Sequence, residues 1–158
     1  MVVSLDASVL EVGQKAPDFT LLADDGQLVT LSAQEGKKVI LYFYPKDDTP
    51  GCTQQACNFR DYYQEFAAKG VVIFGVSKDS ILSHQKFKTK YHLNFPLLTD
   101  ADGTVCKKYG VWQQKTMFGK FFPGIERTTF LIDETGHIQE IWRKVKVAGH
   151  FQEVLKAL

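Results

Sequence analysis

The sequence predicts an α/β fold in which helices flank a mixed central sheet. Two apolar runs, 39–44 (VILYFY) and 71–77 (VVIFGVS), have the length and the β-branched and aromatic content of buried strands, and a segment of helical period separates them. The second half adds strand-like runs at 128–132 and 138–142 and a helix at 149–158. The chain has 158 residues, of which 44% are hydrophobic and 23% charged, so we expect one globular domain over its whole length.

The first elements are expected to be a β-hairpin and a central strand. Residues 16–21 (APDFTL) and 28–31 (LVTL) are strand-like, and the Asp-Gly pair in 24–27 (DDGQ) favours a tight turn between them. The strand at 39–44 comes next, and Pro45 ends it because proline cannot continue the hydrogen bonding of a strand. The loop that follows, PKDDTPG, is rich in turn-forming residues.

A helix is expected over residues 52–69. Its apolar residues are spaced 4, 3, 4, 3 and 1 positions apart, which places them along one helix face, and Gly70 is a suitable stop. Because a helix separates the strands at 39–44 and 71–77, these two strands should run parallel. The apolar face consists of Cys52, Ala56, Phe59, Tyr63, Phe66 and Ala67.

The remaining elements are shorter. We expect a helix over 80–91, a short strand at 95–98, and a short helix over 103–109 that carries Cys106. The segment 113–126 (QQKTMFGKFFPGIE) has no clear period, so we expect a loop that lies over part of the functional site. In the helix over 80–91, the side chains expected to face the core are Leu82, Phe87 and Tyr91.

Composition and charge argue against several function classes. The net charge is +1, whereas a dedicated nucleic-acid binder normally has a strongly basic face. The longest apolar run is far shorter than the ~20 residues that a membrane span requires, and the N-terminus has no signal-peptide pattern. Three cysteines are too few for a secreted disulfide framework. We therefore expect a cytoplasmic protein without nucleic-acid or membrane partners, although an organellar chain that has lost its transit peptide would look the same.

Cys52 stands in the first turn of the expected helix, directly after the loop. The first turn presents unpaired backbone N–H groups and the positive end of the helix dipole, and both favour the thiolate, which is the nucleophilic form of cysteine. An inert buried cysteine is the alternative, but the loop-to-helix placement favours a reactive one. Thr49, three residues upstream, either caps the helix or directs its hydroxyl toward the molecule that the sulfur attacks.

Cys57 lies five positions after Cys52 on the same expected helix. Five helical residues advance roughly 7.5 Å and about 140° around the axis, which separates the two Cα atoms by roughly 8.6 Å. A disulfide requires Cα atoms within about 7 Å. The two cysteines therefore bond only if the first turns of the helix unwind, so a redox cycle would also be a conformational cycle.

These residues resemble a known family. Pro45, Thr49 and Cys52 form the P-x-x-x-T-x-x-C motif of the peroxiredoxins, and 49–61 (TPGCTQQACNFRD) resembles their Q-type, or bacterioferritin comigratory, branch. Further segments are similar in the same order along the chain: APDFTL, FPLLTD, YGVW and ERTTFLID. The resemblance implies a thioredoxin-like fold with an N-terminal β-hairpin, and the activity of a thiol-dependent peroxidase.

The resemblance also implies a role for each motif residue. Cys52 is the peroxidatic cysteine, which attacks the O–O bond and becomes a sulfenic acid, and Cys57 is the resolving cysteine, which condenses with it to a disulfide. Arg127 supplies a guanidinium beside the sulfur, and Thr49 hydrogen-bonds the peroxide. Pro45 shields the sulfur and helps to shape its pocket.

The implied substrates are hydrogen peroxide and organic hydroperoxides. A dithiol such as thioredoxin, or a glutaredoxin-type reductant, restores the thiols. The resemblance implies a monomer that needs no metal or organic cofactor. Two other functions remain open: a thiol–disulfide oxidoreductase, although such enzymes use C-x-x-C rather than C-x-x-x-x-C, and a redox-switched holdase.

The other candidate residues are expected to be structural. Cys106 is expected to be a semi-buried thiol, with the alternative role of a second resolving partner. Asp47 and Asp48 are expected to be solvated, because adjacent loop residues point apart. The histidines show no metal-ligand spacing: His84, His92, His137 and His150. Aromatic residues expected to pack in the core or its rim, or else to form an apolar collar for organic hydroperoxides or for the reductant, are Trp112, Phe118, Phe121 and Phe122.

Overall fold

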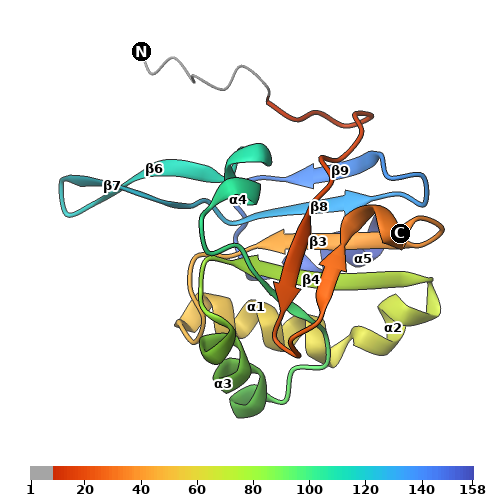
Figure 1. The fold of residues 1–158 in the computed structure, drawn as a ribbon, viewed down its shortest axis with the longest axis horizontal. Coiled ribbons are helices and arrows are strands. Elements are labelled where there is room, and N and C mark those ends of the chain that lie inside the picture. Colours follow the sequence, from red (N-terminus) through yellow and green to blue (C-terminus); the bar gives the residue numbers. More distant parts are fainter. Residues whose placement is uncertain (1–8) are drawn as a thin grey trace.

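The computed structural model describes residues 9–158, which contain nine strands and six helices. Figure 1 shows how these elements are arranged. The strands are β1 (Thr20–Ala23), β2 (Leu28–Thr30), β3 (Lys38–Phe43), β4 (Val71–Ser77), β5 (Leu97–Thr99), β6 (Trp112–Met117), β7 (Lys120–Ile125), β8 (Thr128–Ile132) and β9 (Ile138–Trp142). The helices are the 3₁₀-helix η1 (Leu31–Gln34), α1 (Pro50–Asp61), α2 (Tyr63–Ala68), α3 (Ile81–Tyr91), α4 (Thr104–Lys108) and α5 (His150–Lys156).

Seven of these strands form one mixed sheet in the order β2-β1-β5-β4-β3-β8-β9. β3, β4 and β5 run parallel, as expected for strands connected through helices, whereas β8 pairs antiparallel with β3 and β9 with β8. The expected N-terminal hairpin is confirmed, and β1 joins it to the sheet through β5. The predicted α/β fold with a mixed central sheet is therefore confirmed.

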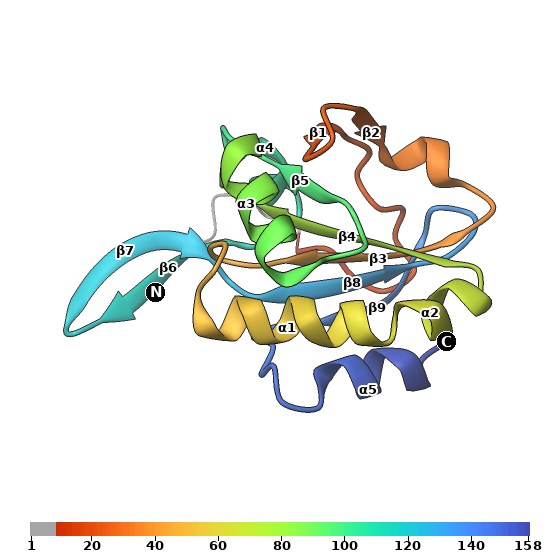
Figure 2. The same cartoon turned by 90° about the horizontal axis from the view of Figure 1, so that it is seen from below.

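The central sheet separates two apolar cores. Alternate residues of β3 point to opposite sides, so Leu41 and Phe43 pack in one core while Ile40 and Tyr42 pack in the other. The second core lies under α1, α2, α3 and α5, and Figure 2 shows α1, α2 and α5 together on one side of the sheet. The first core contains residues of the N-terminal hairpin and α4. β3 is therefore buried on both faces, which explains its unbroken apolar sequence.

Three details differ from the expectations. The helix expected over 52–69 is divided at Tyr62 into α1 and α2, and Ala67 of its apolar face is exposed. On α3, the residue that faces the core beside Phe87 is His84, whereas Leu82 is 60% exposed. A buried histidine breaks the apolar pattern from which the inward face was predicted.

The segment 113–126 is a β-hairpin, not the expected loop. β6 and β7 pair from Trp112↔Ile125 to Met117↔Lys120, and the ribbon projects from the body of the molecule (Figure 2). Its two turn residues, Phe118 and Gly119, have φ values of 52° and 74°, the positive values that tight two-residue hairpin turns require. Phenylalanine is rare at positive φ, so the turn had little sequence signal. Among the described residues, no helix is both long and apolar enough to cross a membrane.

Candidate active site

Cys52 lies where the carboxyl end of β3 leads through a short loop into α1. Thr49 is the N-cap residue and Pro50 occupies the first turn, where its missing N–H would have had no helical partner. The Cys52 side chain faces the sheet, is only 2% exposed, and packs in the core beneath α1. The prediction of a cysteine in the first helical turn is confirmed.

Arg127 brings a positive charge to this sulfur. Its Nη2 donates to Cys52 Sγ at 3.3 Å, and its Nη1 donates to Gln55 Oε1 at 2.7 Å. Cys52 and Arg127 are 75 positions apart, and strand pairing brings them together, because Phe43 at the end of β3 is opposite Thr128 at the start of β8. A cation with directed donors beside a sulfur stabilises its thiolate.

Sequence reasoning missed two residues that hold this guanidinium. Gln55 is 2% exposed and fixes Arg127 from the next turn of α1. A side chain on Gly51 would bring its Cβ to 3.1 Å from Arg127 Nη2, so glycine leaves room for the guanidinium. The available signal was a glutamine three positions after Cys52, a spacing that places both on one helix face.

Thr49 and Pro45 lie in the loop that precedes Cys52. Thr49 makes no side-chain capping bond to the helix; its Oγ1 donates instead to the carbonyl oxygen of Lys46 at 2.9 Å. Pro45 follows the strand and is half-buried. The Thr49 hydroxyl therefore does not cap the helix, which was one of the two roles expected for it.

Cys57 is half-buried on α1, and neither it nor Cys52 is in a disulfide. α1 runs without interruption from Pro50 to Asp61, so it holds both cysteines at helical spacing. This arrangement is the dithiol form, in which the helical spacing holds the two Cα atoms farther apart than a disulfide allows.

Comparisons with known proteins identify the family that this geometry belongs to. The AhpC/TSA family matches residues 12–141. The chain belongs to the AhpC/TSA family of peroxiredoxins. It is 60% identical over 149 residues to a putative peroxiredoxin Bcp of Coxiella burnetii (94% of this chain, 99% of the relative). It is 52% identical to peroxiredoxin Bcp of Bacillus subtilis (94% of this chain, 95% of the relative).

Solved structures agree with this assignment. The bacterioferritin comigratory protein of Xanthomonas campestris, studied for its alkyl peroxide reduction activity, superposes with a TM-score of 0.87 at 42% identity, covering 93% of this chain and 96% of that one. Peroxiredoxin Q of Xylella fastidiosa gives a TM-score of 0.89 at 38% identity, covering 95% and 96%. The predicted Q-type branch and thioredoxin-like fold are confirmed, and the chain is a thiol-dependent peroxidase.

The expectation that Asp47 and Asp48 are both solvated is wrong for Asp47. Asp48 is exposed and pairs with Lys90 and the Tyr91 hydroxyl, each at 2.8 Å. Asp47 is only 7% exposed, and its carboxylate accepts hydrogen bonds from Tyr44 and His84. The positive φ of Asp48 (58°) turns the chain between them, so the two adjacent side chains face different environments.

One histidine of this peroxiredoxin, His84, lies beside two carboxylates. Side-chain ligand atoms of Asp47, Asp79 and His84 lie within 4.8 Å of one another, a spacing that suits a metal ion. Both nitrogens of His84 already face protein acceptors, however, and the Asp47 oxygens already accept hydrogen bonds. The group is therefore described below as a hydrogen-bond network.

Cys106 lies in α4 and is fully buried, not semi-buried. It packs in the core on the other side of the sheet from Cys52. Burial and the neighbouring Asp100 carboxylate raise the pKa of the Cys106 thiol strongly, which keeps it protonated and weakly nucleophilic.

The β6–β7 hairpin corrects the expectation that its aromatic residues are mainly packed. Phe118 and Phe121 are 96% and 77% exposed. Trp112, at the base, is half-buried, and Lys78 Nζ lies 4.3 Å from the centre of its ring. On the same hairpin, burial and the nearby Arg127 guanidinium lower the pKa of Lys115.

Proposed function

We propose that Cys52 is the peroxidatic cysteine and Cys57 the resolving cysteine of this thiol-dependent peroxidase. The observation that carries the proposal is the donor bond from Arg127 Nη2 to Cys52 Sγ, 3.3 Å long, at the N-terminal turn of α1. Both features favour the thiolate, and Gln55 holds the guanidinium in the orientation that makes the contact.

In the first step the Cys52 thiolate attacks one oxygen of the peroxide. The S–O bond forms as the O–O bond breaks, the sulfur becomes a sulfenic acid, and the leaving oxygen takes up a proton to depart as water or as an alcohol. Negative charge develops on the leaving oxygen. Arg127 has further N–H donors that can stabilise this charge, because a guanidinium has five.

Thr49 contributes a hydrogen-bond acceptor in this proposal. Its hydroxyl proton is already donated to the Lys46 carbonyl, so the lone pairs on Oγ1 remain to accept a hydrogen bond from the O–H group of the peroxide. Pro45, half-buried at the start of the same loop, limits the access of water to the sulfur.

Cys57 then condenses with the sulfenic acid. Its sulfur displaces the hydroxyl, which leaves as water, and the Cys52–Cys57 disulfide forms after α1 opens. A dithiol, thioredoxin or a glutaredoxin-type reductant, restores both thiols by two exchanges. Organic hydroperoxides belong among the substrates beside hydrogen peroxide, since the Xanthomonas relative was studied for alkyl peroxide reduction. We place this activity in one monomeric domain in a reducing cytoplasm, as the cysteine content suggests.

Peroxide consumption with thioredoxin, thioredoxin reductase and NADPH tests the assignment. We expect Cys52→Ser to abolish turnover. Cys57→Ser should consume about one equivalent of peroxide, because the sulfenic acid forms but is not resolved. Cys106→Ala, which removes the third thiol, should retain turnover as the matched control. Sustained thioredoxin-linked turnover by Cys57→Ser would contradict the resolving role, and reduction of protein disulfides without peroxide turnover would support an oxidoreductase instead.

A further inference from the structure

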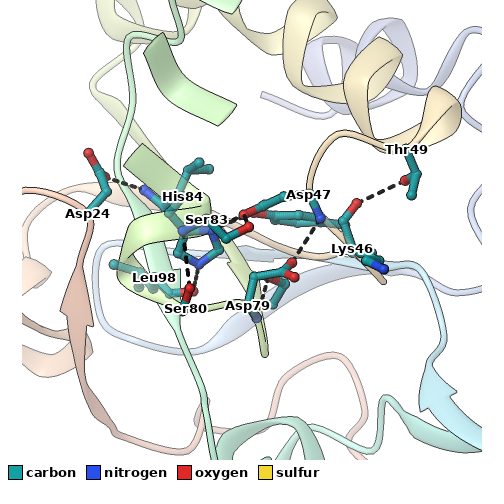
Figure 3. A network of polar contacts seen from close by, with 12 residues as sticks. Asp24, Lys46, Asp47, Thr49, Asp79, Ser80, Ser83, His84 and Leu98 are labelled. Carbon is teal, nitrogen blue, oxygen red and sulfur yellow. Dashed lines mark hydrogen bonds and ion pairs between the residues drawn. The ribbon is translucent and has the colours of Figure 1, made fainter. Parts of the chain in front are cut away.

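A partly buried polar network borders the loop that carries Thr49. It joins three parts of the fold: residues 45–49, the end of β4 with the turn after it, and α3 (Figure 3). Its members, here called the loop anchor, are Asp47, Ser77, Asp79, Ser83 and His84.

The Asp79 carboxylate holds the backbone of the loop. Asp79 Oδ2 accepts a hydrogen bond from the backbone N–H of Asp47 at 2.8 Å and a second from Ser77 Oγ at 2.7 Å. Ser77 is fully buried and also accepts a hydrogen bond from the backbone N–H of Asp79. The carboxylate is thus oriented from β4, a central strand of the sheet.

The N–H that Asp79 binds and the carbonyl that Thr49 binds belong to one peptide group. The Lys46 carbonyl and the Asp47 N–H share the 46–47 peptide bond, which is planar. Fixing the N–H toward Asp79 therefore fixes the direction of the carbonyl. The carbonyl in turn accepts the hydrogen bond from Thr49 Oγ1 (Figure 3), which fixes the rotamer of Thr49 and the direction of its hydroxyl proton.

The side chain of Asp47, the residue whose N–H Asp79 binds, is itself held by further contacts. Asp47 Oδ1 accepts from the Tyr44 hydroxyl at 2.5 Å, and Oδ2 faces His84 Nδ1 at 2.7 Å. His84 Nε2 lies 3.0 Å from the Leu98 carbonyl oxygen. The fully buried His84 thus links the Asp47 carboxylate to the Leu98 carbonyl, and its Nδ1 contact with Asp47 has the geometry of a buried ion pair.

We propose that Asp79, supported by the Asp47–His84 ion pair, is a positioning residue for the peroxidase reaction. It orients the 46–47 peptide so that Thr49 keeps its hydroxyl proton on Lys46 and presents its lone pairs to the O–H of the peroxide. The inference rests on the proposed contact between Thr49 and the peroxide. It predicts that a carboxylate outside the active-site motif controls reactivity toward peroxides specifically, and leaves the reactivity of the thiolate itself unchanged.

Two reactions of the same sulfur test this. The second-order rate constant for Cys52 oxidation by hydrogen peroxide requires the Thr49 contact, whereas that for alkylation by iodoacetamide requires only the thiolate. We expect Asp79→Ala to slow oxidation roughly tenfold, the scale of a small misplacement of a reacting group, with alkylation unchanged. Asp79→Asn retains a carbonyl oxygen that can accept the Asp47 N–H, so it should restore most of the oxidation rate.

Three controls make the outcome decisive. The first is the amplitude of the oxidation signal in rapid-mixing experiments, because partial unfolding lowers this amplitude but leaves the rate constant of the folded molecules unchanged. Asp133→Ala, which removes a carboxylate that accepts backbone N–H bonds in the β8–β9 turn, should leave both rate constants unchanged. In a Thr49→Val background, Asp79→Ala should cause no further loss, because its effect passes through the hydroxyl.

The inference is overturned if Asp79→Ala slows both reactions equally, slows neither, or still slows oxidation in the Thr49→Val background. Its failure is separable from that of the proposed function. If Thr49→Val slows the oxidation of Cys52 but Asp79→Ala does not, only the proposed role of Asp79 is wrong. If Thr49→Val is oxidised at the wild-type rate, the proposed contact between Thr49 and the peroxide is wrong, and so is the inference that depends on it.

Discussion

Replacing Arg127 with methionine is expected to slow the reaction of Cys52 with hydrogen peroxide by roughly two to three orders of magnitude. Arg127 Nη2 lies 3.3 Å from Cys52 Sγ. The substitution removes the cation that favours the thiolate and the donors that stabilise the leaving oxygen, so two contributions to the rate are lost together. Methionine has a similar length and keeps much of the apolar packing of the arginine stem.

Rapid-mixing measurement of Cys52 oxidation checks this expectation, together with the ultraviolet absorbance of the thiolate at neutral pH. Arg127→Lys should fall between wild type and Arg127→Met, because an ammonium supplies the charge but not the planar fork that reaches both Cys52 and Gln55. Arg143→Met is the matched control, since Arg143 donates to the Leu10 carbonyl away from the sulfur. If Arg127→Met is oxidised at the wild-type rate, Arg127 has no role in the reaction of Cys52 with peroxide.

Asp47→Asn is expected to lower the free energy of unfolding by about 3 kcal/mol, the scale for removing one partner of a buried ion pair. The buried Asp47 carboxylate accepts hydrogen bonds from three side-chain donors: Tyr44, Ser83 and His84. An amide of the same shape would turn its NH₂ group against these donors and leave the His84 ring without its carboxylate partner.

Denaturant unfolding measures the loss, and the neighbouring residue supplies the control. Asp48→Asn makes the same chemical change at an exposed position, and asparagine tolerates the positive φ found there (58°). Its unfolding midpoint should stay close to that of wild type, because surface ion pairs contribute little. Equal losses in the two variants, or none in Asp47→Asn, would contradict the assignment of a buried ion pair.

Local patterns predicted the elements around the site well. The apolar run at 39–44 and the helical spacing after Cys52 correspond to β3 and α1, because buried strands and amphipathic helices leave a period in the sequence. The hairpin over 112–125 was missed because its turn contains a phenylalanine at positive φ, where asparagine or glycine normally gives the signal.

Local sequence patterns did not predict the contacts between distant segments. Arg127 entered the site only through the family motif, since the antiparallel pairing of β3 and β8 that brings it to Cys52 leaves no mark on either residue. His84 and Asp47 are 37 positions apart, and each alone resembles a surface residue. Gly51 is required by the guanidinium that passes beside it, so its role appears only with the folded chain.

The central claim is that peroxide oxidises Cys52 and that Cys57 resolves it by opening α1. The most direct test is to treat the reduced protein with one equivalent of hydrogen peroxide, map its disulfides by peptide mass spectrometry, and measure amide hydrogen exchange over residues 50–61. We predict a Cys52–Cys57 disulfide and a loss of protection over the first turns of α1, because helical spacing keeps the two Cα atoms roughly 8.6 Å apart. Unchanged protection in the oxidised protein, or a disulfide to Cys106, would contradict it.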